Sequence, residues 1–343
     1  MKFNGVDFIL NYFFNFGSLL FMIFFFQIFS GILLSFFYSS EDINSFVSVQ
    51  YLMFEVNYGW LIRLIHFNLV SMFFFFLFFH MLKAMFFFSY RLWKVWFIGL
   101  LIFFFLMMES FLGYTLIWSQ MSFWAATVIT SLLSVFPIFG NILIIFLWCG
   151  FFLNSFSLKL FFFLHFMLPI LIFLLIFFHV FFLHDYGSSV KLNNSNSLTK
   201  RSFYPFYWIK DLLNFFFFFI FFIFMLNFPF SFNESLSFMV INNLVSPIHI
   251  VPEWYFLWVY AILRSLTIKW MGVFMMIFSI FIFFFMKITL LNYNLLQNFI
   301  VNFFIFNLIM LTWLGCQEAI YPFVNLSFFF MLIYFFLLIL INM

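Results

Sequence analysis

Long apolar stretches separated by short polar segments dominate the chain. Runs of spanning length occupy residues 15–38, 60–88, 96–118, 160–184, 211–229, 270–290, 298–316 and 325–342. A helix of about 20 apolar residues crosses the hydrocarbon core of a bilayer. The pattern therefore predicts an all-α integral membrane protein with eight transmembrane helices. Because this number is even, both termini are expected on one side of the membrane.

Composition supports the membrane class. The 343 residues are 68% hydrophobic and 7% charged, with a mean hydropathy of +1.23, which excludes a water-soluble globular protein. Runs of phenylalanine such as Phe73–Phe76 and Phe215–Phe219 are interpreted as lipid-facing bulk in a compositionally biased chain. The two cysteines, Cys149 and Cys316, form no metal or redox spacing and are interpreted as packing residues.

Charged residues are divided unevenly between the two ends of the predicted spans. With the N-terminus inside, the inner segments collect basic residues: Lys2, Lys83, Arg91, Lys94, Lys191, Lys200, Arg201, Lys210 and Lys287. The outer segments collect acidic residues: Glu41, Asp42, Glu55, Glu234, Glu253 and Glu318. The positive-inside rule therefore places both termini on the matrix or cytoplasmic side. Spans 60–88 and 160–184 then both run inward.

Four histidines form two pairs with the same spacing in these two inward spans. His66 and His80 lie 14 residues apart, as do His165 and His179. Fourteen residues of helix cover roughly 21 Å and nearly four turns, so both side chains return close to one face. The shared direction puts His66 level with His165 near the outer face and His80 level with His179 near the inner face. Such pairs suit axial ligation of two haem irons, although one intramembrane histidine alone is more often a proton-relay or hydrogen-bonding residue.

Glycines repeat the spacing on the neighbouring spans. Gly17 and Gly31 lie 14 residues apart on the first span, and Gly99 and Gly113 lie 14 apart on the third. Only glycine leaves room for a flat macrocycle close to the backbone. We interpret the glycines as packing against two haems, with ordinary small-residue helix packing as the alternative.

Haem propionates need cationic or hydrogen-bonding partners at the membrane edge. Arg63 lies three residues before the first histidine of its span, and Lys83 lies three residues after the second. Each therefore shares a helix face with a candidate ligand. Ser89 and Trp96 at the inner end are further candidate donors. All four are also interpretable as interfacial anchors.

Several motifs around these residues resemble the cytochrome b family, the di-haem subunit of mitochondrial ubiquinol–cytochrome c oxidoreductase (respiratory complex III). The matching stretches are Asn15–Leu20 (NFGSLL), Asn57–Trp60 (NYGW), Gln120–Trp124 (QMSFW), Ala126–Thr130 (ATVIT), Pro252–Tyr255 (PEWY) and Ala261–Ser265 (AILRS). The resemblance extends from about residue 14 to the C-terminus, and PEWY between the fifth and sixth spans is highly specific. The family has a respiratory form and a photosynthetic form, and the photosynthetic form is split between two chains. Equal histidine gaps in one continuous chain favour the respiratory form.

The resemblance implies a quinone cycle across two b-type haems, one of low and one of high potential. Ubiquinol is oxidised at an outer (Qo) pocket and quinone is reduced at an inner (Qi) pocket, which contributes to a proton gradient. Residues 1–205 would form the di-haem four-helix bundle, and residues 206–343 the C-terminal four-helix part. The implied setting is the mitochondrial inner membrane, in a homodimeric complex with the Rieske iron–sulfur protein, cytochrome c1, other complex III subunits and lipids. No nucleic acid is expected.

The resemblance also assigns roles in the two quinone pockets. Glu253 matches the base that takes protons from hydroquinone at the outer pocket, although an exposed loop carboxylate is the commonest fate of a glutamate. Tyr114 and Tyr260 match pocket tyrosines, and Met107, Phe111, Met121 and Ile129 match the apolar wall. At the inner pocket, His184 and Asp211 match residues that hold the quinone oxygens and relay protons. Lys210 and Ser188 lie close by in the sequence. Without the resemblance, Asp211 could equally be a residue that stabilises a helix N-terminus.

Four positions depart from the family pattern. Lys83 replaces a propionate-binding arginine and lacks its planar fork. Ser119 ends a segment that usually reads Pro-Trp-Gly, so the turn after the third span is expected to differ. Ala125 replaces a glycine and predicts weaker binding of methoxyacrylate-type inhibitors. Glu109 lies inside the third span, where a carboxylate is costly, and the sequence leaves open a neutral, a hydrogen-bonded or a proton-path role.

Two other functions compete with this interpretation. One is a polytopic transporter or channel in which the histidines, Glu109 and Asp211 form a proton relay. It explains the spans but not the matched spacings of histidine and glycine. The other is a stand-alone di-haem quinone reductase, against which the PEWY motif argues, because the family uses that loop where the iron–sulfur partner docks.

Overall fold

The computed structural model describes residues 6–7, 12–187, 200–201, 204–286 and 295–342. This part of the chain is helical apart from one antiparallel pair of two-residue strands, β1 (Val6–Asp7) and β2 (Lys200–Arg201). Seven of its helices are long and apolar enough to cross a membrane: α1 (Phe16–Ser35), α3 (Gly59–Phe86), α4 (Trp93–Thr115), α7 (Ser155–Tyr186), α8 (Phe206–Asn227), α11 (Leu295–Cys316) and α12 (Phe323–Asn342). They correspond to seven of the eight predicted spans.

The sixth predicted span, 270–290, differs from the others. Its place is taken by α10 (Lys269–Phe281), a helix of 13 residues that continues as a 3₁₀ turn, η7 (Ile282–Phe285). Together they form an apolar helix shorter than a full span. The rest of the predicted span, from residue 287, lies outside the described residues.

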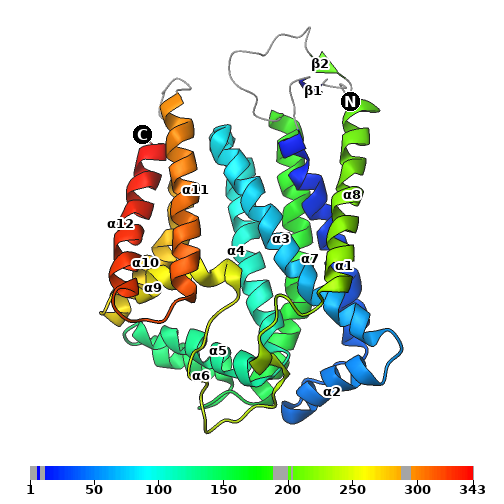
Figure 1. Ribbon diagram of the computed structural model, residues 1–343, viewed down its shortest axis with the longest axis vertical. Helices are drawn as coiled ribbons and strands as arrows, with labels where there is room; N and C mark the ends of the chain where they lie inside the picture. Colours follow the sequence, from blue (N-terminus) through cyan, green and yellow to red (C-terminus); the bar gives the residue numbers. More distant parts are fainter. Residues whose placement is uncertain (1–5, 8–11, 188–199, 202–203, 287–294, 343) are drawn as a thin grey trace.

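The long helices run side by side, and short helices lie across one end of them (Figure 1). These short helices are α2 (Asp42–Phe54), α5 (Gln120–Ser131) and α6 (Gly140–Trp148). A fourth, α9 (Leu257–Arg264), lies beside α10. Strand β1 and the C-terminal end of α12 both lie at the opposite end of the long helices, on different sides of the molecule (Figure 1). The hydropathy pattern did not predict the short helices, because none approaches spanning length.

Capping boxes fix the starts of two helices. Before α5, the Ser119 hydroxyl accepts the backbone N–H of Ser122, while the Ser122 hydroxyl accepts that of Ser119. Asn154 and Ser157 form the same reciprocal pair before α7. Each cap satisfies backbone N–H groups that a helix start leaves unpaired. The departure at Ser119 therefore gives the turn after α4 a defined function as a helix cap.

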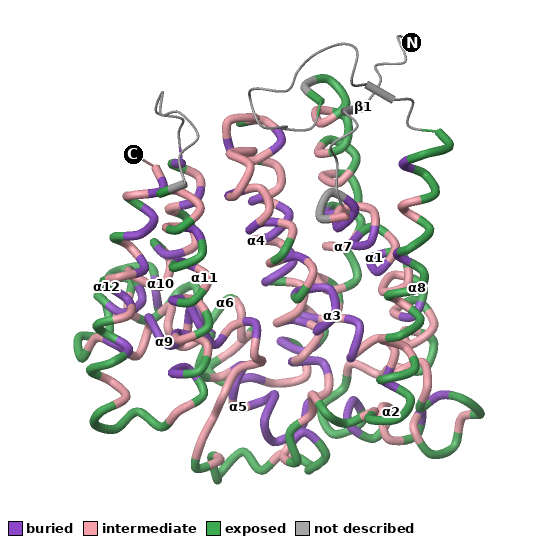
Figure 2. Tube along the Cα trace, turned by 45° about the horizontal axis from the view of Figure 1, so that its top comes forward, coloured by how far each residue is buried: buried purple, intermediate pink, exposed green. Residues whose placement is uncertain are grey.

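Two helix pairs carry the closest packing, α4 with α7 and α1 with α3. Buried side chains gather along α1, α3 and α4, whereas α7 and α8 are exposed along most of their length (Figure 2). The hydrophobic core between the long helices includes Leu19, Ile23, Phe74, Phe103 and Ile172. The exposed apolar faces of α7 and α8 suit contact with lipid or with other membrane subunits.

The phenylalanine runs have two different fates. In α8, Phe215 and Phe216 are 58% and 60% exposed, as the lipid-facing interpretation requires. In α3, Phe73 and Phe74 are only 6% and 2% exposed and belong to the core, so that interpretation is wrong for them. Their positions on the face of α3 that meets the other helices explain the difference, because successive helix residues point in different directions.

Candidate functional site

The structure brings the four histidines together in the two predicted pairs. His66 on α3 and His165 on α7 face each other with ring centroids 6.3 Å apart and ring planes at 89°. His80 and His179 have the same centroid distance of 6.3 Å and an angle of 62°. Two metal–imidazole bonds of about 2 Å each, together with the two ring radii, account for a separation of this size. Each pair therefore leaves room for one metal between its rings.

The four glycines explain how the rings are held. On α1, Gly31 and Gly17 lie against the two histidines of α3, and an added Cβ would lie 3.1 and 3.5 Å from ring carbons. On α4, Gly113 and Gly99 lie against the histidines of α7 at 2.7 and 3.1 Å. The shared spacing of glycine and histidine thus reflects two packed helix pairs in which glycine accommodates imidazole. A contact between glycine and a macrocycle stays a prediction.

Hydrogen bonds orient both rings of the outer pair. The Nδ1 atom of His66 lies 3.0 Å from the Ser30 hydroxyl. The Nδ1 atom of His165 lies 2.8 Å from a carboxylate oxygen of Glu109 and 3.1 Å from its backbone oxygen. Because these partners occupy Nδ1, the Nε2 atom of each ring is left for a metal.

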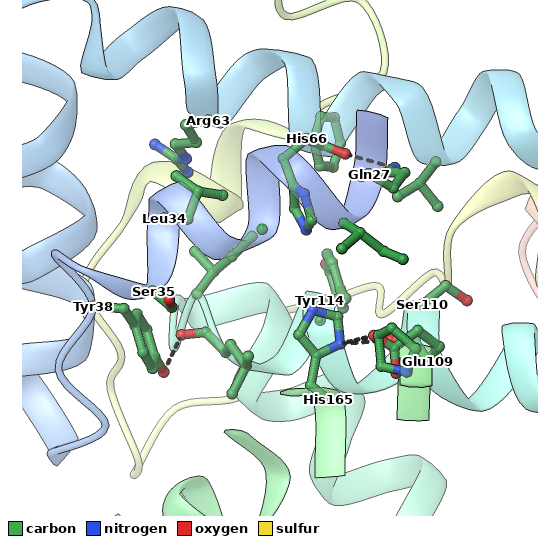
Figure 3. A pocket seen from close by; sticks show the side chains of 18 of the residues that line it. Gln27, Leu34, Ser35, Tyr38, Arg63, His66, Glu109, Ser110, Tyr114 and His165 are labelled. Carbon is green, nitrogen blue, oxygen red and sulfur yellow. Dashed lines mark hydrogen bonds and ion pairs between the residues drawn. The ribbon is translucent and has the colours of Figure 1, made fainter. Parts of the chain in front are cut away.

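One cavity joins the outer histidines to other predicted residues. It has a volume of about 520 Å³, within the range of about 300–1,000 Å³ typical of ligand pockets. Its lining includes His66, His165, Gly31, Gly113, Arg63, Glu109, Tyr114 and Glu253. Figure 3 shows Arg63, Tyr114 and the two histidines around this space.

The residues around the cavity fit a haem. The Nη1 atom of Arg63 is buried with no hydrogen-bond partner among the described residues. A buried, unpaired guanidinium N–H is suited to an anionic group such as a propionate. The two opposed imidazoles are the residues that would hold the iron of such a haem.

Glu253 is not an exposed loop carboxylate. It is half-buried directly before the 3₁₀ turn η6 (Trp254–Phe256), and it lines the same cavity as Tyr114. Burial, followed by the negative charge of Glu234, raises the pKa of Glu253 from 4.5 to about 7. A carboxylate that changes protonation near neutral pH is suited to accept protons as a general base.

The rest of the PEWY motif anchors this loop. The Tyr255 ring stacks on Phe74 with centroids 4.1 Å apart, and the Trp254 indole N–H donates to the Ser71 hydroxyl at 3.2 Å. Tyr260 lies elsewhere: its hydroxyl donates to the backbone oxygen of Ile250 at 3.5 Å. Outside the lining of the cavity lie Tyr260, Met107, Phe111, Met121, Ile129 and Ala125.

At the inner end, Asp211 has partners that the sequence analysis missed. Its carboxylate accepts hydrogen bonds from Ser18 Oγ at 2.7 Å and from Asn15 Nδ2 at 2.9 Å. Ser18 in turn accepts a bond from Asn214 Nδ2 at 2.8 Å, and the Tyr12 hydroxyl donates to Asn214 Oδ1 at 2.7 Å. Both Asn15 and Ser18 belong to the NFGSLL motif, so the motif was the sequence signal that could have pointed to these partners of Asp211. Asp211 is therefore part of a polar network rather than a simple helix-terminal residue.

The remaining inner residues that the structure describes come from four elements, α7, α8, α3 and η2. His184 is exposed near the end of α7, and the Lys210 ammonium lies 5.3 Å from the centre of the Tyr207 ring. The Lys83 ammonium lies 5.6 Å from the centre of the Phe87 ring. Ser89 opens the 3₁₀ turn η2 (Ser89–Arg91). Ser188 lies outside the described residues.

Trp96 has a structural partner. Its indole N–H donates to the backbone oxygen of Phe283 at 2.9 Å, which ties α4 to η7. A role as propionate donor would require this bond to be replaced, because the indole has a single donor.

Comparison with known proteins decides the family. The model of the family "Cytochrome b/b6/petB" matches residues 4–187, and that of "Cytochrome b(C-terminal)/b6/petD" matches residues 240–335. The chain belongs to the cytochrome b family. Cytochromes b of Caenorhabditis briggsae and Caenorhabditis elegans are each 44% identical to it over 325 residues, which is 94% of this chain and 88% of theirs. That of Apis mellifera ligustica is 41% identical over 332 residues, or 95% and 87%.

A solved structure extends the likeness to the fold. A chain described as "Hyperthermophilic respiratory Complex III" superposes with a TM-score of 0.93 at 25% identity, covering 99% of this chain and 92% of the other. The fold is therefore that of cytochrome b, as the sequence motifs predicted. Cytochromes b are haem-binding electron-transport proteins, so family membership sets aside the transporter or channel interpretation.

Proposed function

We propose that this cytochrome b is the catalytic core of a respiratory complex III and carries two haem b groups. His66 and His165 hold the low-potential haem near the outer face, and His80 and His179 hold the high-potential haem near the inner face. The observation that carries the proposal is the pair of opposed imidazoles at 6.3 Å on both levels. A haem with two imidazole ligands supplies reversible one-electron transfer, because its iron has no free position for other chemistry.

The chain's own residues prepare these positions. Gly17, Gly31, Gly99 and Gly113 make room for the ligand rings. Arg63 neutralises a propionate of the outer haem, and Lys83 does the same at the inner haem, with Ser89 as a further donor there. Trp96 can join them only if its N–H leaves the backbone oxygen of Phe283. Burying charged groups in the membrane is favourable only when each is paired in this way.

At the outer pocket, Glu253 accepts a proton from ubiquinol. The contact of this carboxylate with the cavity and its pKa of about 7 support the role, because the base is available at neutral pH. Tyr114 and Tyr260 position the substrate, and Met107, Phe111, Met121 and Ile129 supply the apolar wall. The iron–sulfur partner would accept one electron, and the haems held by the two histidine pairs would supply the path for the other.

At the inner pocket, His184 and Asp211 hold the quinone oxygens and deliver protons, with Lys210 and Ser188 nearby. The hydrogen bonds from Ser18 and Asn15 support this role for Asp211, because they fix the carboxylate in one orientation. Reduction inside and oxidation outside together move charge across the membrane.

The proposed assembly follows from the same family. The chain crosses the mitochondrial inner membrane eight times, with α10 and η7 in the sixth span and both termini in the matrix. Residues 1–205 form the di-haem bundle, and residues 206–343 form the C-terminal four-helix part. Partners are the Rieske iron–sulfur protein, cytochrome c1, other complex III subunits, lipids and a second copy of the chain. The fit to a complex III chain supports this arrangement.

A reduced-minus-oxidised optical spectrum of the purified complex tests the proposal. We expect two b-type haem bands per chain and quinol-dependent reduction of both. A purified, folded chain without haem would contradict the proposal, and so would a single haem per chain.

A further inference from the structure

One charged contact inside the membrane-spanning helices is not used by the electron-transfer path. Glu109 on α4 points toward α7, where its Oε1 atom lies 2.8 Å from Nδ1 of His165 (Figure 3). The side chains are 14% and 20% exposed, so little solvent screens the pair. The second carboxylate oxygen, Oε2, is buried with no hydrogen-bond partner among the described residues.

The position of Glu109 is determined by the packing of α4 on α7. Gly113 lies four residues further along α4, on the same face, and an added Cβ there would lie 2.7 Å from the His165 ring. The imidazole is thus held between a glycine, which leaves it room, and a carboxylate, which receives its N–H. A carboxylate in the interior of a membrane protein is costly, and His165 is its partner here.

The partner of His165 differs from those of the other candidate ligands. His66, on the opposite side of the same metal position, has the neutral Ser30 hydroxyl at 3.0 Å from its Nδ1 atom. In the inner pair, neither His80 nor His179 has a carboxylate of any described residue within 4.0 Å. A carboxyl partner therefore distinguishes one candidate ligand of the outer haem position from the other three.

A metal-bound imidazole that donates its second N–H to a carboxylate becomes a more basic, more electron-donating ligand. Stronger donation favours the higher oxidation state of the iron and so lowers its reduction potential. We propose that Glu109 is a positioning residue for His165 that lowers the midpoint potential of the outer haem. The proposal rests on the proposed function, because it requires a haem between His66 and His165.

The test is a potentiometric titration of the b-type absorbance in the assembled complex, comparing the natural chain with Glu109→Gln. The amide keeps the size and an acceptor oxygen but removes the negative charge. We expect the reduction equilibrium of the outer haem to shift toward the reduced form by roughly tenfold, which equals about 59 mV for one electron. The inner haem is the internal control, and its potential should not change.

Two further variants make the result decisive. Glu109→Asp keeps the carboxyl group but draws it back from Nδ1 of His165 by one methylene group, so it should raise the potential measurably, although less than Glu109→Gln. If Glu109→Gln does not retain haem, the aspartate variant decides alone, and an unchanged outer potential contradicts the proposal. Met108→Leu, on the preceding residue of α4, should leave both potentials in place, because Met108 is exposed and lies outside the cavity lining.

The outcomes separate this inference from the function on which it rests. If both haems are present and neither potential changes in Glu109→Gln or Glu109→Asp, the role of Glu109 is overturned and the proposed function is left intact. An equal shift at both haems would also overturn it, because that result indicates a general structural change. A natural complex without two b-type haems would instead overturn the proposed function.

Discussion

The outer and inner histidine pairs share one frame but differ in their surroundings. On both levels two imidazoles face each other at 6.3 Å, and each ring packs on a glycine of the neighbouring helix. The outer pair alone lines the cavity of about 520 Å³ that also contains Glu253, and it has the carboxylate of Glu109 at 2.8 Å. The repeat therefore builds two similar metal positions, and residues outside the repeat make them different.

The contrast between the two pairs indicates that the helical spacing and the residues outside it have different roles. The repeat of histidine and glycine sets where a haem can bind, because it fixes ligands and space. In the proposed function, the polar side chains that lie off the repeat adjust the potential and the access of substrate at each level. Substitutions that change one histidine pair and leave the other unchanged show which residues cause the difference between the two levels.

The largest expected effect is the loss of one haem. Under the proposed function, His165→Leu removes a ligand of the outer haem, and His179→Leu removes one of the inner haem. Each variant should lose one of the two b-type bands and keep the other, as measured by difference spectra of the isolated complex. Loss of both bands in each variant would show that the two positions are not independent.

The next largest effect concerns the outer base. Glu253→Gln cannot accept a proton, and we expect quinol oxidation to fall by roughly 10²–10⁴-fold, while both haems remain. A turnover assay together with a haem spectrum measures this. A variant with ordinary turnover would exclude Glu253 as the base.

The pH dependence of the natural protein sharpens this result. Because burial raises the pKa of Glu253 to about 7, the folded protein holds this proton more tightly than an exposed glutamate would. The base form is therefore lost as the pH falls through 7, and quinol oxidation should decrease in that direction. Removing the nearby charge by Glu234→Gln lowers the pKa of Glu253, so the rate profile should move to lower pH. A profile that stays in place would contradict the electrostatic coupling.

A matched pair of glycine variants compares the two levels directly. In Gly113→Ala the new methyl group would lie 2.7 Å from the His165 ring, whereas in Gly17→Ala it would lie 3.5 Å from His80, an ordinary contact distance. We expect haem affinity to fall roughly 10–100-fold at the outer position in the first variant, with little change in the second. Haem content per chain after purification measures both, and equal losses would contradict the packing argument.

The smallest expected effect is on stability. Ser119→Ala removes the hydroxyl that caps α5 and should reduce the free energy of unfolding by about 1 kcal/mol. Thermal unfolding of the complex measures it, with Ser134→Ala, at an exposed serine, as a control. Haem content should be normal in both variants, because neither Ser119 nor Ser134 lines the cavity.

Periodic features of the molecule were predictable from the sequence. Seven spans, the two histidine pairs and the glycines beside them follow from repeats within single helices, which local geometry fixes. The short helices α2, α5, α6 and α9 were not predicted, since a search for spanning length passes over segments of 8–13 residues. The contact of Glu109 with His165 depends on the register between α4 and α7, which no single-helix pattern contains.

The sequence was less informative about the pockets. Glu253 and Tyr114 do line one cavity, but Tyr260 and the expected apolar wall lie outside its lining. Loop conformation determines these positions, and loops have no periodic signal to read. The network around Asp211 was missed for a related reason, because it joins residues almost 200 positions apart, such as Asn15 with Asp211.

A potentiometric titration of the b-type absorbance in the purified complex tests the central claim most directly. Two metal positions with different surroundings predict two resolved one-electron steps of similar amplitude, with His165→Leu removing one step and leaving the other at its original potential. A single step, or the absence of b-type absorbance from a folded chain, would contradict the account.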